Sequence, residues 1–331
     1  MIKTPCLLVT GVNRVELGEA ELAEPGPEEV LIETALSSIS PGTELRCLAG
    51  QQEGGSGEYF PFIPGYSLVG KVVRTAGRYA SLEGQVVFCA GARQARPRAM
   101  WGAHIGHAVA PAAKVVPIPA GVSLEDASLL KLAGIAYRGV RLARPVPGEC
   151  AVVVGLGPIG QMSARLLAHA GARVIGVDLS PERVRLAEAA GITGVVPTDG
   201  LGPSVRRLLP NGSPIVVDAT GARALLPQTT GLVWDKPWDE SETPGGRLIV
   251  QGSYPGDMTL AYSVAFMKEM GMFWPRDSQR RDLEFVAASL AAGSLSFAGL
   301  LGGVFPPAEA QAVYNRLRAA QAGFLTAAFR W

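Results

Sequence analysis

The chain has 331 residues, of which 30 are Lys or Arg and 29 are Asp or Glu, so its formal net charge is +1. Because 48% of the residues are hydrophobic, the chain can build a sizeable core, which excludes intrinsic disorder. The near-zero charge argues against a nucleic-acid binder and against an electrostatic membrane anchor. At roughly 150 residues per domain, the length predicts two domains.

No segment has the pattern of a membrane span, a secretion signal or a cysteine framework. The apolar runs fall short of the roughly 18 residues that a membrane helix needs, and the apolar patch near the start is interrupted at Asn13 and Arg14. The four cysteines are widely spaced without a CxxC pair, which disfavours a zinc ribbon or a disulfide framework. We therefore expect a cytoplasmic protein that binds neither nucleic acid nor a membrane.

The first 120 residues predict a β-rich domain. Short strand candidates alternate with turn signals at EPGPEE, SPGTE and IPAG, as in an antiparallel barrel or sandwich. The candidate strands are Cys6–Thr10, Glu29–Ala35, Leu68–Arg74, Gln85–Cys89 and His107–Val116.

The pattern changes after Pro119. Ser123 is a candidate N-cap, with Asp126 three residues later, for a helix over 124–140. Short β-branched runs then alternate with amphipathic segments as far as RLIVQG, which closes the series. This alternation predicts a buried parallel sheet with helices on its faces.

We therefore expect an α/β protein of two domains. The β-rich domain spans 1–120, and the doubly wound domain spans 121–290. Residues 291–331, which end in a candidate strand FLTAAFR, are expected to return to the first domain.

The most specific motif is a glycine-rich turn between a strand and a helix. Gly155, Gly157 and Gly160 form GxGxxG directly after the strand AVVV. The first glycine permits the tight turn, the second lets a pyrophosphate approach the backbone, and the third lets the helix pack on the strand. An acidic residue, Asp178, ends the next strand, as a dinucleotide-binding βαβ unit requires.

Asp178 also predicts which dinucleotide is bound. A carboxylate at this position accepts hydrogen bonds from the ribose hydroxyls and repels a 2′-phosphate, so NAD is favoured over NADP. Arg183 and Arg185, on the following helix, either soften this preference or are solvated helix residues.

Five segments give the chain a resemblance to the medium-chain dehydrogenase/reductase superfamily. They are PGTE (41–44), PGYSLVGKVV (64–73), GLGPIG (155–160), VDATG (217–221) and PGGRLIVQGS (244–253). The resemblance implies a GroES-like catalytic domain, a Rossmann domain, an active site between them, and a homodimer or homotetramer. We expect the substrate to be a small alcohol or ketone. The cofactor contacts it implies are Gly155, Gly157, Pro158, Ile159, Gly160, Asp178, Arg183, Thr220 and Gly252. The segments SPGTE and PIPAG are also similar to those of bacteriochlorophyllide dehydrogenases.

Many alcohol dehydrogenases of this superfamily hold a catalytic zinc, but its ligand positions are changed here. Ser40 stands where the first cysteine is expected, Tyr66 and Ser67 replace the His-Glu pair, and Lys131 stands at the third ligand position. Zinc requires Cys, His or carboxylate ligands, so the sequence predicts an enzyme without catalytic zinc.

Lys131 is the candidate replacement for the metal. It interrupts the apolar helix SLLKLAG, where partial burial beside the positive nicotinamide would make it a general acid or base. The alternative is a lysine whose stem covers the core while its charge reaches water.

The other catalytic candidates are polar residues of the first domain. Tyr66 either binds and protonates the substrate oxygen or is a packing aromatic. Glu44 either pairs with Lys131 or is structural. Thr43 falls near a proton-relay position, and Ser40 is a candidate substrate contact. His104 either lines the cleft or is a satisfied structural histidine.

Two later segments are weaker candidates. WDKPWDESETPGG (234–246) forms a lid, an oligomer contact or only a surface loop, and Arg276 either reaches the cofactor pyrophosphate or lies in a solvated turn.

Three functions remain open on these residues. The first is a zinc-independent, NAD-dependent dehydrogenase of a polar secondary alcohol such as a sugar, a cyclitol or a biosynthetic intermediate. The second is an enone or quinone reductase, and the third is a non-catalytic NAD-binding protein. Asp178 favours the first over the second, since such reductases usually use NADPH.

Overall fold

In the computed structural model, which describes residues 1–51, 60–75, 77–92, 94–239, 242, 244–254 and 256–331, the chain divides into two units. The first comprises Met1–Leu132 and Leu283–Trp331, and the second comprises Ala133–Asp282. The domain boundaries expected from the sequence, 120/121 and 290/291, differ from these divisions. The difference at the first boundary arises because helix α2 (Leu124–Ser128) packs on the sheet of the first unit.

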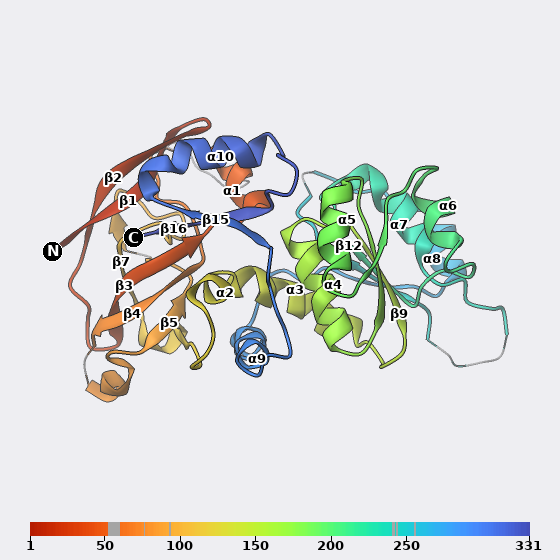
Figure 1. Ribbon diagram of the computed structural model, residues 1–331, viewed down its shortest axis with the longest axis horizontal. Coiled ribbons are helices and arrows are strands. Elements are labelled where there is room, and N and C mark those ends of the chain that lie inside the picture. Colours follow the sequence, from red (N-terminus) through yellow and green to blue (C-terminus); the bar gives the residue numbers. More distant parts are fainter. Residues whose placement is uncertain (52–59, 76, 93, 240–241, 243, 255) are drawn as a thin grey trace. The chain divides into compact units, whose positions relative to one another are not determined.

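The second unit is built on a six-stranded parallel sheet (Figure 1). The strand order is β11-β10-β9-β12-β13-β14, so the order reverses between β9 and β12. The strands are β9 (Cys150–Val154), β10 (Arg173–Val177), β11 (Thr193–Val195), β12 (Ile215–Asp218), β13 (Arg247–Val250) and β14 (Gly271–Phe273). In sheets of this kind, ligands bind at the carboxyl ends of the strands where the order reverses.

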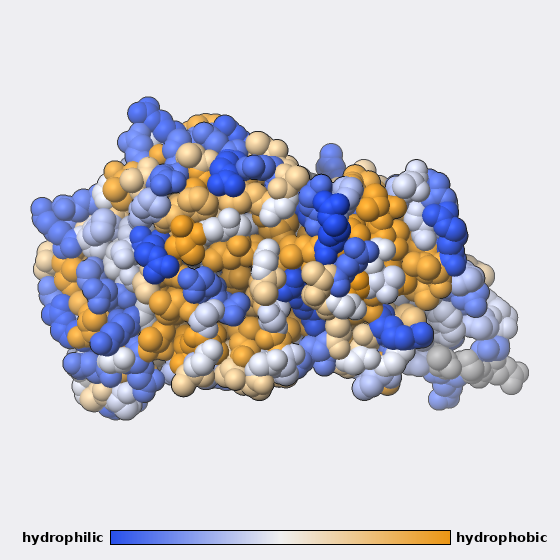
Figure 2. All heavy atoms as spheres, viewed as in Figure 1, coloured by the Kyte–Doolittle hydropathy of each residue, from blue (hydrophilic) through white to orange (hydrophobic). Residues whose placement is uncertain are grey.

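Helices alternate with the strands of this sheet, as the pattern predicts. They are α4 (Pro158–His169), α5 (Pro181–Glu188), α6 (Leu201–Arg206), α7 (Leu226–Leu232) and α8 (Tyr262–Met267), with a 3-10 turn at Arg223–Leu225. Two further helices, α3 (Leu130–Ala143) before β9 and α9 (Arg280–Ala291) after β14, cross the divisions between the units. The outer face of α5 carries charged, exposed side chains such as Glu182 and Arg185, and it forms a blue area in Figure 2.

The first unit contains two sheets. A seven-stranded sheet has the order β15-β16-β3-β4-β5-β8, with β7 also paired to β3, and a three-stranded sheet has the order β1-β2-β6. The strands are β1 (Ile2–Gly11), β2 (Arg14–Leu22), β3 (Glu29–Ser38), β4 (Leu68–Arg74), β5 (Val86–Cys89), β6 (Ala95–Arg96), β7 (His107–Pro111), β8 (Val116–Pro117), β15 (Leu301–Phe305) and β16 (Thr326–Arg330). Strand β16 pairs antiparallel with β3, so the last strand of the chain joins the sheet of the N-terminal segment.

Short helices complete the first unit: α1 (Pro41–Leu48), α2 and α10 (Ala310–Arg318), with 3-10 turns at Gly77–Leu82, Ala112–Lys114 and Pro307–Glu309. The interpretation of SPGTE as a turn is wrong, because α1 begins at Pro41. Proline is favoured at the first helical position, and the Glu44 carboxylate accepts a hydrogen bond from the Ser40 N–H, so these residues start a helix.

The fold class predicted from the sequence is confirmed, while several elements differ from the expectation. The candidate helix over 124–140 is two helices, because the chain turns at Leu129 between α2 and α3. The parallel sheet does not end at β13, since Gly271–Phe273 adds a sixth strand too short to show a β pattern. Strand β2 was not predicted because its many glutamates obscure the alternation. Among the described residues, no helix is both long and apolar enough to cross a membrane.

Candidate functional site

The glycine-rich turn connects β9 to α4 and has the geometry that its motif predicts. Gly155 has φ of +87°, and a Cβ there would lie 3.0 Å from the backbone of Ala219 and Thr220. A Cβ at Gly160 would lie 1.7 Å from the Gly155 carbonyl oxygen. These two glycines are therefore required by the packing of the chain on itself.

Gly157 differs from its two neighbours, because a Cβ there would have no atom within 4 Å. It is the N-cap of α4 and borders a cavity of about 810 Å³. Nothing in the described chain needs a glycine at this point, whereas a pyrophosphate on the N-terminus of α4 would need the open backbone. The site therefore fits a dinucleotide.

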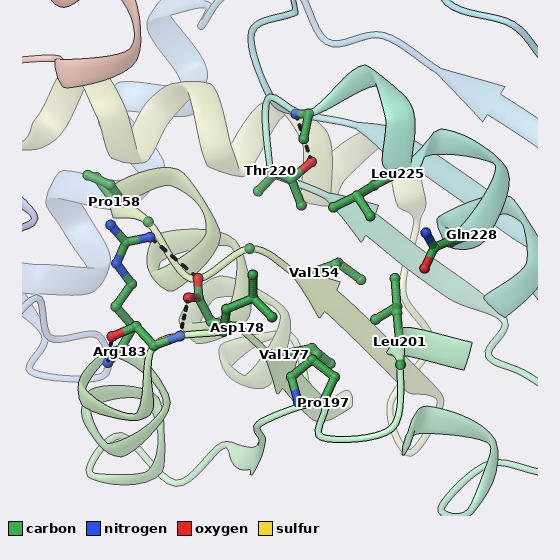
Figure 3. Close-up of a pocket in the computed structure, with 17 residues that line it drawn as sticks. Val154, Pro158, Val177, Asp178, Arg183, Pro197, Leu201, Thr220, Leu225 and Gln228 are labelled. Atoms are coloured by element: carbon green, nitrogen blue, oxygen red, sulfur yellow. Dashed lines mark hydrogen bonds and ion pairs between the residues drawn. The ribbon is translucent and has the colours of Figure 1, made fainter. Parts of the chain in front are cut away.

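The cavity lies at the carboxyl ends of β9, β10 and β12 (Figure 3). Its lining is mostly apolar, with a few polar groups, as is usual for cofactor sites. The lining residues are Val154, Gly155, Gly157, Pro158, Val177, Asp178, Leu179, Ser180, Arg183, Pro197, Gly200, Leu201, Ala219, Thr220, Ala222, Leu225 and Gln228.

Asp178, directly after β10, is held in a fixed orientation. Its Oδ2 accepts a hydrogen bond from Leu156 N at 2.7 Å, and its Oδ1 accepts one from Ser180 N at 2.8 Å. Arg183 Nη1 lies 3.5 Å from Oδ2, and Figure 3 shows the two side chains pointing toward one another. The carboxylate thus shapes the glycine-rich turn and also partly neutralises the nearest arginine.

The opposite wall is organised by Asp218 at the end of β12. Its Oδ1 accepts hydrogen bonds from the Thr220 hydroxyl at 2.7 Å and from Tyr254 at 2.5 Å. Burial, together with the negative charge of Asp218, raises the pKa of Tyr254 well above its usual value, so this phenol stays protonated. Thr220 is therefore held at the cavity by a fully buried carboxylate.

Six of the predicted cofactor contacts line the cavity: Gly155, Gly157, Pro158, Asp178, Arg183 and Thr220. Ile159, Gly160, Gly252 and Arg276 do not, and Arg276 is exposed. Leu201, Leu225 and Gln228 line it without having been predicted, because they belong to helices whose sequences carry no motif. In the 234–246 segment, Trp238 is exposed, while 240–241 and 243 lie outside the described residues.

A second group of polar side chains lies in the first unit, and we call Ser40, Thr43 and Tyr66 the hydroxyl cluster. Ser40 immediately precedes α1, Thr43 is in its first turn, and Tyr66 comes two residues before β4. The Tyr66 hydroxyl donates a hydrogen bond to Ser40 Oγ and lies 3.3 Å from Thr43 Oγ1. The Trp101 ring makes an edge contact with the Tyr66 ring at 5.3 Å.

Glu44 lies beneath this cluster and is fully buried. Its carboxylate accepts hydrogen bonds from Ser40 N at 2.6 Å and from the Tyr314 hydroxyl at 2.5 Å, and it lies 2.9 Å from His104 Nε2. Among the described residues, these three groups are the side-chain and backbone partners of the Glu44 carboxylate, and Lys131 is not one of them, which agrees with the alternative in which Glu44 is structural. His104 is also fully buried and does not line the dinucleotide cavity.

Burial, followed by the negative charge of Glu44, raises the pKa of Tyr314 well above its usual value. Tyr314 is thus a permanent donor to the carboxylate. Sequence analysis did not identify it, since it lies 270 positions from Glu44 and belongs to an otherwise ordinary amphipathic helix.

Lys131 lies in the first turn of α3 and is half-buried. It shares the first unit with the hydroxyl cluster. Ser67, the neighbour of Tyr66, is buried and donates its hydroxyl proton to the Ser128 carbonyl at 2.5 Å.

Comparisons with known proteins agree with this architecture. Residues 158–273 match the zinc-binding dehydrogenase family. The chain is 29% identical over 318 residues to 2-desacetyl-2-hydroxyethyl bacteriochlorophyllide A dehydrogenase of Rhodobacter capsulatus, covering 95% of this chain and 94% of that one.

Solved structures show the same fold over nearly the whole chain. An alcohol dehydrogenase from Escherichia coli CFT073 complexed with NADH matches with a TM-score of 0.85 at 18% identity, covering 99% of both chains. A putative zinc-binding dehydrogenase from Sinorhizobium meliloti 1021 bound to NADP matches with a TM-score of 0.84 at 18% identity, covering 100% of both chains.

The residues at the expected zinc positions do not fit that metal. Ser40, Tyr66, Ser67 and Lys131 offer hydroxyls and an amine, whereas zinc sites use thiolates, imidazoles and carboxylates. The hydroxyls of Ser40 and Tyr66 bond to each other, and that of Ser67 bonds to the backbone. Within the part of the chain that the structure describes, no three His, Cys, Asp or Glu side chains gather in a way that would hold a metal ion.

Proposed function

We propose that this chain is a zinc-independent, NAD-dependent dehydrogenase of the medium-chain dehydrogenase/reductase superfamily, acting on a polar secondary alcohol. One observation carries the proposal. The positions expected to bind zinc hold a hydrogen-bonded hydroxyl cluster over a buried carboxylate, while the dinucleotide cavity keeps its glycine-rich turn and Asp178.

The preference for NAD rests on Asp178. Its carboxylate borders the cavity and, although each oxygen accepts one backbone N–H, each keeps a further acceptor site for a ribose hydroxyl. A 2′-phosphate would meet this negative charge, and Arg183, the nearest cation, is already drawn toward it. When bound, NAD⁺ supplies the hydride acceptor for the oxidation.

The hydroxyl cluster supplies the proton transfer that the oxidation needs. In this proposal the substrate hydroxyl donates its proton to the Tyr66 oxygen while Tyr66 passes its own proton to Thr43 Oγ1. Thr43 is partly exposed and releases its hydroxyl proton to water in the same relay, and Ser40 holds the Tyr66 hydroxyl in place. In the reverse direction Tyr66 protonates the carbonyl oxygen.

Lys131 is proposed to supply the positive charge that a metal ion supplies elsewhere. An ammonium near the substrate oxygen stabilises the alkoxide that develops as the proton leaves. The half-buried position at the start of α3 suits this role, because partial burial strengthens the interaction.

The proposed substrate class is supported by the same hydroxyl groups. A cluster of three hydroxyls can exchange hydrogen bonds with a polar alcohol and with the ketone formed from it. The relative in Rhodobacter capsulatus is a dehydrogenase whose name specifies a hydroxyethyl substituent, which agrees with an alcohol as the reacting group.

The first test measures NADH formation with a strong chelator present throughout. Purified protein is assayed with NAD⁺ and a panel of sugars, cyclitols and simple secondary alcohols. We expect turnover that the chelator does not reduce and less than one zinc ion per chain by elemental analysis. Loss of activity in the chelator, with recovery on adding zinc, would contradict the proposal. If no alcohol of the panel is oxidised but the protein reduces enones, the result would favour the reductase alternative.

Replacing Lys131 by Ala is expected to lower kcat about 10- to 1,000-fold, because one electrostatic contribution to the transition state is removed. Lys131→Arg keeps the positive charge and should retain more activity. The Kd for NADH should not change. Lys114→Ala serves as the control, since Lys114 is an exposed residue of the same unit. Full activity in Lys131→Ala would show that this lysine only covers the core.

A further inference from the structure

The Glu44 carboxylate is buried without water contact, and every donor around it can be named. Oε1 accepts from Ser40 N, and Oε2 accepts from the Tyr314 hydroxyl and faces His104 Nε2 at 2.9 Å. The Tyr314 ring packs against the Phe329 ring, and the Phe329 ring also makes an edge contact with the His104 ring at 5.2 Å. A buried carboxylate is tolerated only when its acceptor sites are filled in this way.

The hydrogen-bond chain continues beyond His104 to the last residue of the sequence. Ser37 Oγ lies 2.7 Å from His104 Nδ1, and Trp331 Nε1 donates to the same Ser37 Oγ at 2.8 Å. Ser37 is fully buried at the end of β3, and the two partners come from distant segments of the chain.

Chemistry fixes the direction of two of these hydrogen bonds. An indole N–H can only donate, so Ser37 Oγ accepts from Trp331. The carboxylate can only accept, so His104 Nε2 carries a ring proton and donates it to Glu44. The Ser37 hydroxyl has a second acceptor site as well as its own proton, so it can pair with His104 Nδ1 in either direction.

The chain of hydrogen bonds ends at the hydroxyl cluster. Glu44 holds the N–H of Ser40, whose side chain accepts the Tyr66 proton, so the carboxylate determines where that hydroxyl pair lies. We propose that Glu44 is the positioning residue for the Ser40–Tyr66 pair, and that His104, itself held by Ser37 and Trp331, donates from Nε2 to the Glu44 carboxylate and keeps it in place. The catalytic meaning of this positioning role rests on the proposed function. The geometry of the Ser40–Tyr66 pair can nevertheless be measured without an activity assay.

The first experiment compares Glu44→Gln and Glu44→Asp with Glu83→Gln, an exposed carboxylate of the same unit. In Glu44→Gln an NH₂ group replaces one carboxylate oxygen, so a donor faces one of the native donors. In Glu44→Asp the negative charge of the carboxylate is kept. We expect kcat to fall about 10- to 100-fold in Glu44→Gln, the cost of losing a hydrogen bond to a charged group, with partial recovery in Glu44→Asp and no change in Glu83→Gln. The Kd for NADH should stay constant in all three.

The second readout does not need catalysis. Fluorotyrosine incorporated into the full chain gives a fluorine signal for Tyr66, identified by its loss in Tyr66→Phe. We expect this signal to move in Glu44→Gln and to stay in place in Glu83→Gln. An unmoved signal in a folded Glu44→Gln protein would overturn the positioning role. Should Glu44→Gln fail to fold, the same comparison is made in Glu44→Asp, where a smaller movement is expected.

The third readout is nitrogen NMR of the histidine rings, of which the chain has 3. The His104 signals are assigned by elimination with His107→Gln and His169→Gln. The native protein should show a proton on His104 Nε2, the nitrogen that faces the Glu44 carboxylate. The Nε2 signal should move in Glu44→Gln and stay in place in Glu83→Gln. A native ring without a proton on Nε2 would refute the proposed contact with Glu44.

The two proposals can fail separately. A native protein that oxidises no alcohol, yet shows the expected fluorine and nitrogen signals, contradicts the proposed function alone. An active protein in which the Tyr66 fluorine signal does not move on Glu44→Gln contradicts the positioning role alone.

Discussion

Replacing Tyr66 by Phe is expected to lower kcat about 100- to 10,000-fold, the usual range for removing a general acid–base group. The change deletes one oxygen, which is the donor to Ser40 Oγ and the neighbour of Thr43 Oγ1. The aromatic ring remains and can still pack against Trp101. Steady-state kinetics with the substrate found in the alcohol panel measure the effect on kcat and KM separately.

The loss should fall on proton transfer and leave the cofactor untouched. We therefore expect the Kd for NADH to remain constant and the thermal unfolding temperature to change little. Tyr79→Phe is the matched control, since Tyr79 lies in the 3-10 turn Gly77–Leu82 of the same unit. A Tyr66→Phe protein with native kcat would show that Tyr66 is a packing residue and that the proton leaves by another route.

Replacing Asp178 by Asn is expected to exchange the cofactor preference. NAD should bind about 10- to 100-fold more weakly, because the ribose loses hydrogen bonds to a charged acceptor. NADP should bind more tightly for two reasons. The negative charge that repels its 2′-phosphate disappears, and Arg183, which in the native protein lies 3.5 Å from the Asp178 carboxylate, loses this charged partner and can pair with the phosphate. Ratios of kcat/KM for the two cofactors, with Kd values for NADH and NADPH, measure the change.

A second substitution tests the role of Arg183 in this exchange. In the Asp178→Asn background, Arg183→Ala should remove most of the gain in NADP binding, whereas Arg183→Ala alone should affect NAD little. Asp257→Asn, an exposed carboxylate of the same unit, is the control. Unchanged selectivity in Asp178→Asn would mean that the ribose is recognised by other residues of the cavity.

The dinucleotide site could largely be predicted from the sequence, because its determinants are local. Gly155, Gly157 and Gly160 lie within six positions, and the strand and helix on either side are continuous segments. Asp178 ends the next strand, and parallel pairing of β9 with β10 places it beside the turn. Residues such as Leu225 and Gln228 could not be predicted, since they reach the cavity only through the placement of β12 and α7.

The hydroxyl site was only partly predictable. Ser40, Tyr66 and Lys131 were identified because each stands where the superfamily places a zinc ligand, and that resemblance supplied the register. The partners of Glu44 could not be predicted, because spacing along a β-rich domain does not determine which segments pack against each other. Tyr314 and Trp331 carried no signal at all.

The order of residues along the chain was enough to predict the fold class, the alternation of strands and helices in the second unit, and the glycine-rich turn with its acidic partner. These features depend on hydrophobic period and on residues near each other along the chain. The buried carboxylate network is defined by the folded chain alone, because Glu44 contacts Tyr314 across 270 positions and Ser37 contacts Trp331 across 294. A buried polar group must find its donors wherever the packing brings them, so the partners follow from the fold and not from the local pattern.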